Sequence, residues 1–335
     1  MKCYNQKMLP VPHCPICDNP VGKSFFRYFS AETTLSKCKN CSLVFLNPRP
    51  AQQEVLDLYD EEYFEGKGFD QSVDYKTEYF NPSASEIYAQ QLKLREVQMH
   101  LKTTSQKPKL LDIGCGYGLF LKTASNLGFE AEGVELCTPI GQATQQRTGF
   151  KVHTGPIESV ANSLPENHYD VISMIEVIEH LTNPVPVMKA LSRCLKPGGA
   201  FFIQTGNIES IQARLAGSSW SYFIFPGHLC YYSPRSLRAL FSVSGLNNVV
   251  ICPPRRFHKN SKAHQILRKV SFLDHDDLPT TYLAKLLLHT VDWFLGIREV
   301  ILSPGMFGIA INDGKTKPLS RPKTSVSASL QNHTL

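Results

Sequence analysis

The sequence has few features that would direct the chain to a membrane or to a polyanion. No uncharged stretch is long enough to span a bilayer, and the first twenty residues hold no apolar run that could be the core of a signal peptide. Lys and Arg are scattered, and the formal net charge is only +6, with a pI near 8.7. These absences argue against a nucleic-acid patch and lead us to expect a cytoplasmic protein.

The most apolar long stretch, residues 282–302, is interrupted by the ionisable side chains of Lys285, His289, Asp292, Arg298 and Glu299. Such interruption is typical of an amphipathic helix. We expect a helical insert over about 260–302 that acts as a lid, a dimer surface or a contact with a lipid-linked substrate. Helix-spaced apolar residues favour core or interface contacts over membrane association.

Ten cysteines in a chain without an export signal point to a reducing compartment, where paired cysteines bind metals more often than they form disulfides. Four of them form two pairs, Cys14 with Cys17 and Cys38 with Cys41, separated by twenty mostly polar and aromatic residues. Two thiolates on each of two tight turns can close a tetrahedron around zinc. Residues 1–50 are therefore predicted to form a zinc ribbon, whose four thiolates leave no open position for catalysis.

The rest of the chain divides into three sections. Residues 51–107 combine helical periodicity with aromatic side chains, and we expect a helical bridge into the main domain. From Lys109, short apolar runs alternate with helical stretches, which is typical of an open, mostly parallel sheet covered on both faces. We predict a Rossmann-like, doubly wound α/β domain over 108–312 and a disordered tail over 313–335.

A predicted strand leads into a glycine-rich loop, LLDIGCGYG, at residues 110–118. Gly114, Gly116 and Gly118 permit a tight turn and a close approach of the backbone to a ligand at the carboxyl end of a parallel strand. A second strand ends about twenty residues later at Glu135, where a carboxylate can accept both hydroxyls of a ribose. The spacing of the glycines and of Glu135 alone does not exclude a dinucleotide as the ligand.

Four motifs decide between these ligands: LLDIGCGYG with Asp112 before the first glycine, GVEL, YDVISMIEVIEHL and LKPGGAFFI. Together, over residues 108–250, they closely resemble class I S-adenosylmethionine-dependent methyltransferases. The resemblance implies that the glycine loop, Cys115 included, wraps the methionine end of the cofactor. It also implies that Asp112 supports the loop and that Glu135 holds the ribose. Dinucleotide enzymes usually carry a differently spaced Gly-x-Gly-x-x-Gly, so hydride transfer is disfavoured.

The end of the third predicted strand departs from the family pattern. Gly155, Pro156 and Ile157 stand where many family members place an acidic residue that contacts the adenine amine. Pro156 cannot make that contact with its side chain. We therefore expect adenine to be recognised by backbone groups near Ile157 or by Glu158.

The N-terminal motifs CPIC, CKNCSLVFLNPRP and LYDEEYF resemble a subgroup of bacterial methyltransferases that carry a zinc ribbon ahead of the catalytic domain. Members of this subgroup serve surface-polysaccharide and secondary-metabolite pathways. The resemblance implies that the ribbon and bridge cap the substrate cleft. Sugar C-methyltransferases of the subgroup have a large C-terminal domain, and this sequence holds no evident copy of it. This difference weakens the assignment to sugar C-methylation, which is kept as an alternative.

The stretch IEVIEHL, residues 175–181, sets Glu176, Glu179 and His180 at helical spacing, on the rim where cofactor and substrate meet. Three roles stay open: support of the fold near a helix N-terminus, proton transfer, and binding of Mg²⁺ or Mn²⁺. Glu-x-x-Glu-His here is similar to the metal-binding element of ubiquinone-pathway O-methyltransferases and of small-RNA 2′-O-methyltransferases. Such a metal would grip two substrate oxygens and lower the pKa of one.

His228, in FPGHLCYYS, follows an aromatic segment that borders the acceptor pocket in related methyltransferases. An imidazole there could take the proton from a hydroxyl as the methyl group arrives, or it could hydrogen-bond the loop shut. We predict His228 as the base, with Glu176 and His180 completing the catalytic set.

These features predict an enzyme that uses S-adenosylmethionine to methylate a small-molecule or glycan-linked acceptor, at oxygen. Its cofactors would be structural Zn²⁺ and, where the Glu-Glu-His set binds a cation, Mg²⁺. An RNA methyltransferase that binds through the ribbon is the main alternative, weakened because the basic residues of 1–50 are not clustered. A non-catalytic module is disfavoured by the intact glycine loop and Glu135.

Overall fold

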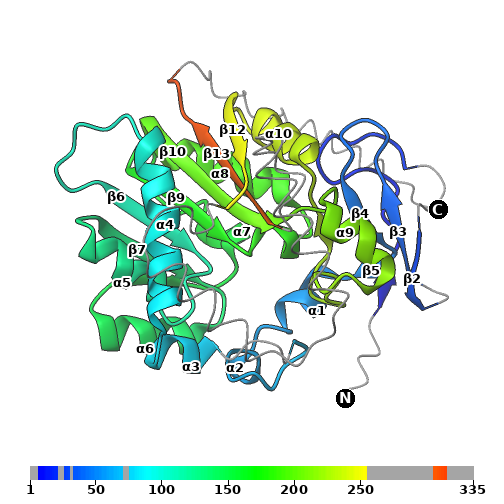
Figure 1. The fold of residues 1–335 in the computed structure, drawn as a ribbon, viewed down its shortest axis with the longest axis horizontal. Helices are drawn as coiled ribbons and strands as arrows, with labels where there is room; N and C mark the ends of the chain where they lie inside the picture. Colours follow the sequence, from blue (N-terminus) through cyan, green and yellow to red (C-terminus); the bar gives the residue numbers. More distant parts are fainter. Residues whose placement is uncertain (1–6, 22–25, 31–32, 71–74, 255–304, 315–335) are drawn as a thin grey trace, which may run out of the picture.

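A seven-stranded sheet forms the centre of the protein, as seen in a computed structural model that describes residues 7–21, 26–30, 33–70, 75–254 and 305–314. Helices pack on both faces of this sheet (Figure 1). Its strand order is β12 (Asn248–Cys252), β13 (Gly305–Ile311), β10 (Leu195–Gly206), β9 (Tyr169–Ile175), β6 (Lys109–Ile113), β7 (Glu130–Glu135) and β8 (Lys151–Thr154).

The sheet is parallel from β10 to β8, and only β13 runs antiparallel to its neighbours. The helices of this domain are α4 (Ala84–His100), α5 (Leu119–Asn126), α6 (Thr138–Thr148), α7 (Ile157–Val160), α8 (Pro184–Cys194), α9 (Ile211–Ala216) and α10 (Pro234–Val243). The predicted fold class, a doubly wound and mostly parallel sheet of the class I methyltransferase type, is confirmed.

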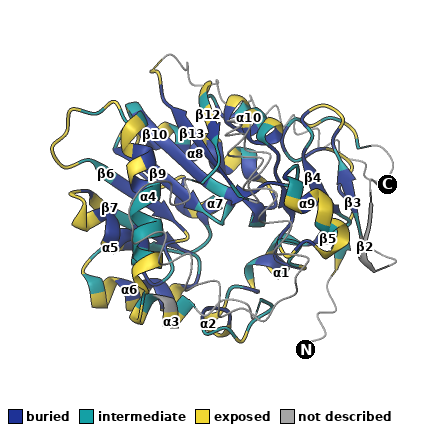
Figure 2. Ribbon diagram, viewed as in Figure 1, coloured by how far each residue is buried: buried dark blue, intermediate teal, exposed yellow. Residues whose placement is uncertain are grey.

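The central strands are mostly apolar on both faces because helices cover both of them. Consecutive residues of β9, Val171 and Ile172, are fully buried, as are Phe201, Phe202 and Ile203 of β10. Figure 2 shows this buried centre, with exposed residues on the outer surfaces of α5 and α6. The strand ends therefore form a rigid edge on which a site can be built.

The N-terminal part forms a second, smaller sheet in the order β11 (Cys230–Tyr231), β4 (Val44–Asn47), β3 (Thr33–Lys37) and β2 (Phe26–Ser30). Strands β1 (Met8–Leu9) and β5 (Arg49–Pro50) pair beside it. We call the described residues 7–50 the ribbon. Its sheet is completed by β11, which comes from the later part of the chain.

The bridge, residues 51–107, contains α1 (Gln52–Leu56), α2 (Glu61–Phe64), α3 (Tyr75–Phe80) and α4. The helix α4 begins at Ser83, whose Oγ accepts a hydrogen bond from the Glu86 N–H, while the Glu86 carboxylate accepts from the Ser83 N–H. All of the predicted insert at 260–302, and all of the predicted tail at 313–335 except its first two residues, lie outside the described residues. Among the residues that are described, no helix is both long enough and apolar enough to cross a membrane.

One glycine lets α10 pack directly on the sheet. A Cβ at Gly308, in the middle of β13, would lie 2.7 Å from Leu237 Cδ2 and 2.8 Å from Phe241 Cε2, both on α10. A Cβ at Gly305, at the start of the same strand, would meet its nearest atom, Pro254 Cγ, at an ordinary 3.6 Å.

We therefore predict that Gly308→Ala lowers the free energy of unfolding by about 1–3 kcal/mol, because the added methyl group overpacks the contact with α10. Urea denaturation followed by circular dichroism measures the change. Gly305→Ala is the matched control and should stay within about 0.5 kcal/mol of the parent protein. Equal losses in the two variants would contradict the packing argument.

Candidate functional site

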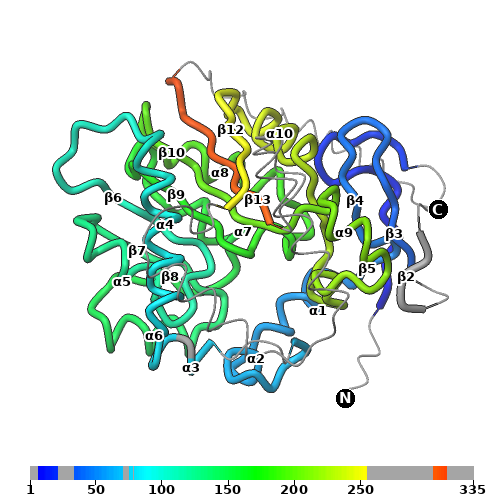
Figure 3. Tube along the Cα trace, in the orientation of Figure 1, coloured from blue at the N-terminus to red at the C-terminus, as the bar shows by residue number. Residues whose placement is uncertain are grey.

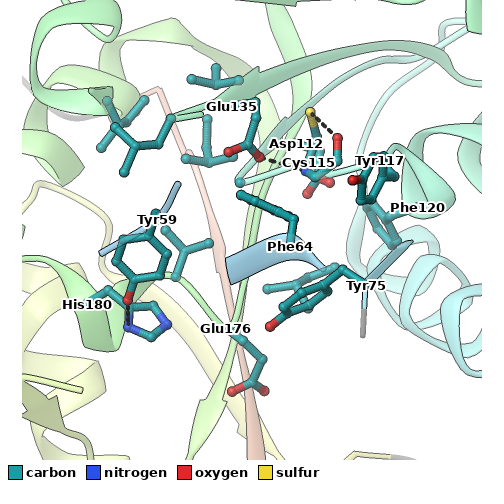
Figure 4. Close-up of a pocket in the computed structure, with 18 of the residues that line it drawn as sticks. Tyr59, Phe64, Tyr75, Asp112, Cys115, Tyr117, Phe120, Glu135, Glu176 and His180 are labelled. Atoms are coloured by element: carbon teal, nitrogen blue, oxygen red, sulfur yellow. Dashed lines mark hydrogen bonds between the residues drawn. The ribbon is translucent and has the colours of Figure 1, made fainter. Parts of the chain in front are cut away.

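A cavity of about 350 Å³ lies at the carboxyl ends of the central strands, under the bridge. The glycine loop and Glu135 line one part of it, and Glu176, His180 and Gln204 line another. Figure 4 shows Asp112 and Glu135 on one side and Glu176 and His180 on the other, with the Phe64 side chain between them. The predicted cofactor residues thus share one cavity with Glu176 and His180.

The glycine loop follows β6 in a conformation that requires glycine. Gly114, Gly116 and Gly118 all have positive φ values, of 74°, 50° and 87°. A Cβ at Gly114 would also lie 2.6 Å from Val177 Cγ2. The loop therefore turns sharply into α5 and exposes its backbone to the cavity.

Glu135 ties this loop to the end of β7. Its Oε2 accepts a hydrogen bond from the Gly116 N–H at 2.8 Å, and its Oε1 accepts from the Cys137 N–H at 2.9 Å. Burial raises the pKa of Glu135 to about 7, although the two N–H donors act in the opposite direction. Each carboxylate oxygen keeps a second lone pair, which a ribose hydroxyl could use.

Asp112 lies within β6, and it also lines the cavity. Its Oδ1 accepts a hydrogen bond from the Ser173 Oγ of β9, at 2.7 Å. Burial raises the pKa of Asp112 to about 7, and the Ser173 hydroxyl opposes that shift. Asp112 thereby links the strand that precedes the loop to the neighbouring strand.

Ile157 and Glu158, predicted to recognise adenine, both line the cavity. Glu158 Oε1 accepts a hydrogen bond from Gln52 Nε2 of α1 at 2.9 Å, whereas Glu158 Oε2 is buried with no partner among the described residues. Thr182 and Gln204 also line the cavity, and one side-chain oxygen of each, Thr182 Oγ1 and Gln204 Oε1, is likewise buried with no hydrogen-bond partner among the described residues. Buried polar atoms without partners are costly, so these three fit a cavity that holds a polar ligand.

The helical face expected for Glu176, Glu179 and His180 is not formed. Glu176 follows β9 with a positive φ of 52°, and only Ile178–His180 are helical, in a short 3-10 turn labelled η1. The two carboxyl groups nevertheless meet, because the Tyr222 hydroxyl contacts both of them, at 2.6 Å from Glu176 Oε2 and also at Glu179 Oε1. The expected cluster exists, but a tyrosine from the aromatic loop assembles it.

This carboxyl pair is buried and strongly coupled. Burial and, second to it, the adjacent Glu179 raise the pKa of Glu176 to about 8. Burial also raises the pKa of Glu179, while Thr205 Oγ1 donates to its Oε2 at 3.0 Å. Without a cation, the pair therefore holds a proton at neutral pH.

The two histidines lie against each other, with ring centroids 4.7 Å apart. His180 Nδ1 lies 3.0 Å from the Gly227 carbonyl oxygen, and His228 Nδ1 lies 2.8 Å from the Tyr222 carbonyl oxygen. Carbonyl acceptors favour the tautomer with hydrogen on Nδ1, which makes each Nε2 the candidate ligand or base. Burial lowers the pKa of both rings, so both are neutral.

Glu179, His180 and His228 each offer a ligand atom, and these atoms lie within 4.8 Å of one another. The sequence placed Glu176 in this metal set and kept His228 apart as the base. His228 is only 5% exposed and is not among the cavity-lining residues, whereas His180 is. The role of His228 as the base stays a prediction. Because His228 does not line the cavity, it would have to receive the proton by way of His180.

Comparison with known proteins agrees with this geometry. Residues 85–251 match a family model described as a methyltransferase domain. These residues form a methyltransferase domain. Over 129 residues the chain is 32% identical to the ubiquinone biosynthesis O-methyltransferase of Methylococcus capsulatus, covering 37% of this chain and 53% of that protein. Over 104 residues it is 33% identical to the Pseudomonas fluorescens protein of the same name, covering 30% and 44%.

The chain thus spans about half the length of the curated relatives it matches. Among solved structures, it is similar to a SAM-dependent methyltransferase from Archaeoglobus fulgidus, with 20% identity and a TM-score of 0.47, over 71% of this chain and 98% of that one.

The four cysteines of the ribbon lie together beside the methyltransferase domain. Their Sγ atoms approach to 3.4 Å between Cys14 and Cys41 and to 3.5 Å between Cys17 and Cys38, and all four fall within 4.8 Å. The hydrogen bond between Cys14 and Cys41 lowers the pKa of Cys14 to about 5 and raises the pKa of Cys41, so without a metal ion these two sulfur atoms share a proton. Four converging sulfur ligands on two tight turns fit a tetrahedral metal ion.

Sequence reasoning did not identify Tyr59 and Gln52 of the bridge, or the specific role of Tyr222. Tyr59 Oη lies 2.6 Å from His180 Nδ1, and Gln52 binds Glu158, so the bridge contacts both ends of the cavity. The signal that was available is the density of aromatic residues in the bridge, several of which line the cavity: Tyr59, Tyr63, Phe64, Tyr75 and Tyr79.

We predict that the purified protein carries about one zinc per chain and that Cys17→Ser loses it, because three thiolates and a hydroxyl bind zinc far more weakly than four thiolates. Plasma mass spectrometry of protein purified without chelators measures the content. Cys252→Ser, outside the cluster, should retain the metal. Equal metal content in the two variants would exclude the four-cysteine site.

Proposed function

We propose that this protein transfers a methyl group from S-adenosylmethionine to a hydroxyl group of a small-molecule or glycan-linked acceptor. The observation that carries the proposal is the single cavity that joins the glycine loop and Glu135 to Glu176 and His180. The relatives named as ubiquinone biosynthesis O-methyltransferases support oxygen as the methylated atom.

The cofactor half of the cavity fits a nucleoside. Glu135 would accept the ribose hydroxyls, and the unpartnered Glu158 Oε2 would accept a hydrogen bond from the adenine amine. The glycine loop would enclose the methionine end. When bound, S-adenosylmethionine supplies an electrophilic methyl group. The chain then has to align the acceptor with it and exclude water, for which the aromatic side chains of the bridge are suited.

The acceptor half can assist loss of the hydroxyl proton. With no cation bound, His180 faces the cavity as a neutral imidazole whose Nε2 can receive the proton, whereas in a cation-bound site the same Nε2 would be a ligand. We further propose that Glu179, His180 and His228 hold a divalent cation such as Mn²⁺ or Mg²⁺, which when bound lowers the pKa of a nearby hydroxyl. Hydrogen bonds from both Nδ1 atoms to backbone carbonyls orient the rings as in known metal-binding histidines.

The RNA alternative receives no support from the ribbon. Its apolar residues Leu43, Val44 and Phe45 are buried in a core that also contains Leu229 and Tyr231 of the methyltransferase domain. The ribbon is thus packed into the enzyme, where it can shape the acceptor end of the cavity.

To test the function, the protein is incubated with methyl-labelled S-adenosylmethionine and an extract separated into small molecules, lipid-linked glycans, RNA and protein. Label is expected in the small-molecule or glycan fraction and should be absent with Glu135→Ala. Label confined to RNA or protein would overturn the substrate class. If EDTA abolishes transfer, recovery with Mn²⁺ or Mg²⁺ alone assigns the ion to the Glu179 cluster, whereas recovery with Zn²⁺ alone assigns it to the ribbon.

Cofactor affinity should depend on pH through Glu135. Its carboxylate form accepts the ribose hydroxyls, and burial raises its pKa to about 7. Affinity for S-adenosylhomocysteine is therefore full above about pH 8 and falls, by up to about tenfold per unit, as the pH drops below 7. The same raised pKa means that Glu135 stabilises the ligand-free fold at low pH. This stabilisation is lost as pH rises through about 7.

Calorimetric titration with S-adenosylhomocysteine between about pH 6 and pH 8 measures this dependence. Glu135→Gln should bind more weakly with a shallower pH profile, whereas Glu158→Gln should keep the parent slope. An unchanged slope in Glu135→Gln would remove Glu135 from cofactor binding.

The Tyr59 hydroxyl should align the acceptor. The single hydrogen on His180 Nδ1 is shared between the Gly227 carbonyl oxygen at 3.0 Å and Tyr59 Oη at 2.6 Å, so Tyr59 accepts in this contact and its own hydrogen can be donated to an acceptor oxygen. We predict that Tyr59→Phe lowers kcat/KM for the acceptor about tenfold, equivalent to the loss of one hydrogen bond. Tyr63→Phe, which removes a hydroxyl bonded to Tyr75 at 3.0 Å in the same cluster, should change it less than about threefold. Equal decreases in kcat/KM for the two variants would assign the loss to altered packing of the aromatic cluster and not to the Tyr59 hydroxyl.

A further inference from the structure

The ribbon and the methyltransferase domain are joined through the backbone as well as through side chains. Strand β4 pairs with β11, with Phe45 opposite Cys230 and Val44 opposite Tyr231. The pairing begins directly after the second cysteine turn, where the Cys38 N–H donates to the Leu43 carbonyl at 2.8 Å. A metal ion that holds this turn therefore also holds the start of β4.

Leu229 connects β4 to the acceptor end of the cavity. Its carbonyl oxygen accepts a hydrogen bond from the Leu46 N–H of β4, and its own N–H donates to the Glu179 carbonyl, both at 2.9 Å. Leu229 is fully buried, as is Glu179, so water cannot replace either bond without opening the core. One residue thus lies between the ribbon and the carboxyl cluster.

Arg49 provides a second connection. Its Nη1 donates to the Thr182 carbonyl at 2.7 Å, across 133 residues of sequence. Thr182 is buried and lines the cavity, two residues after His180. The charge of Arg49 strengthens this bond, which anchors the segment that carries Glu179 and His180.

The cofactor end depends on other residues. The glycine loop is held by Glu135, by Thr144 Oγ1 and by Arg147, which donates to the Tyr117 carbonyl at 2.9 Å. Figure 3 shows the ribbon strands β2, β3 and β4 at the opposite end of the molecule from β6, β7 and α5. The hydrogen bonds that Leu46 and Arg49 of the ribbon make therefore lead to the acceptor end, whereas the glycine loop is held by other residues.

We propose that the metal-bound ribbon is a positioning element of the transfer site, and that Arg49 is the positioning residue through which it fixes residues 178–182. The inference deepens the proposed function, since it assigns to the four-cysteine centre the geometry of Glu179 and His180. Loss of the metal or of the Arg49 guanidinium would loosen the acceptor end while cofactor binding persists.

Hydrogen exchange of the full-length protein, measured by mass spectrometry, tests this inference with Arg49→Gln. Peptides covering 176–183 should exchange about tenfold faster, while peptides covering 110–118 stay within about twofold. The zinc content and the affinity for S-adenosylhomocysteine, measured by calorimetry, should be unchanged. Removal of zinc from the parent protein should extend the faster exchange to residues 226–233.

Arg235→Gln is the matched control, because Arg235 also donates to a backbone carbonyl across the same boundary, that of Asn40 at 2.6 Å. It should leave exchange at 176–183 within about twofold of the parent. Unchanged exchange there in Arg49→Gln, or equal acceleration at 110–118, would overturn the proposal. None of these measurements requires an acceptor. If they give the expected results but the protein transfers no methyl group, only the proposed function is contradicted, and the inference about the ribbon stands.

Discussion

The Tyr222 hydroxyl between two buried carboxyl groups is the interaction on which the site depends. Glu179 is fully buried where β9 ends, and Glu176 beside it is half-buried at the wall of the cavity. Two negative charges at such a place are strongly unfavourable unless a proton or a cation accompanies them. Burial raises the pKa of both groups, Glu176 has a positive φ of 52°, and the neighbouring histidines provide ligands for a cation.

The parallel sheet explains why such a cluster can serve a cofactor. The carboxyl ends of β6, β7, β9 and β10 meet at one edge, and the cavity opens there. One half is built from local backbone, with the glycine loop bound to Glu135. The other half needs side chains from the bridge and from the aromatic loop. Cofactor binding and acceptor binding therefore rest on separate sets of residues.

This division also decides how much the sequence could predict. The glycine loop, Glu135 and the cysteine pairs are short-range patterns with one structural solution, and the alternation of strands and helices sets the sheet. The contact of Tyr59 with His180 spans 121 residues, and Tyr222 reaches Glu176 across 46, so both depend on packing. The helical spacing of Glu176 and Glu179 was misleading, because a strand end with a turn intervenes.

The central claim is that one cavity brings a methyl donor to the Glu176, Glu179 and His180 cluster. A crystal structure with S-adenosylhomocysteine and Mn²⁺, with anomalous diffraction recorded for the metal, tests it directly. We expect the ribose at Glu135, the sulfur directed toward Glu176, and a Mn²⁺ peak between Glu179, His180 and His228. A ligand bound outside the cavity, or one whose sulfur points away from Glu176, would contradict it.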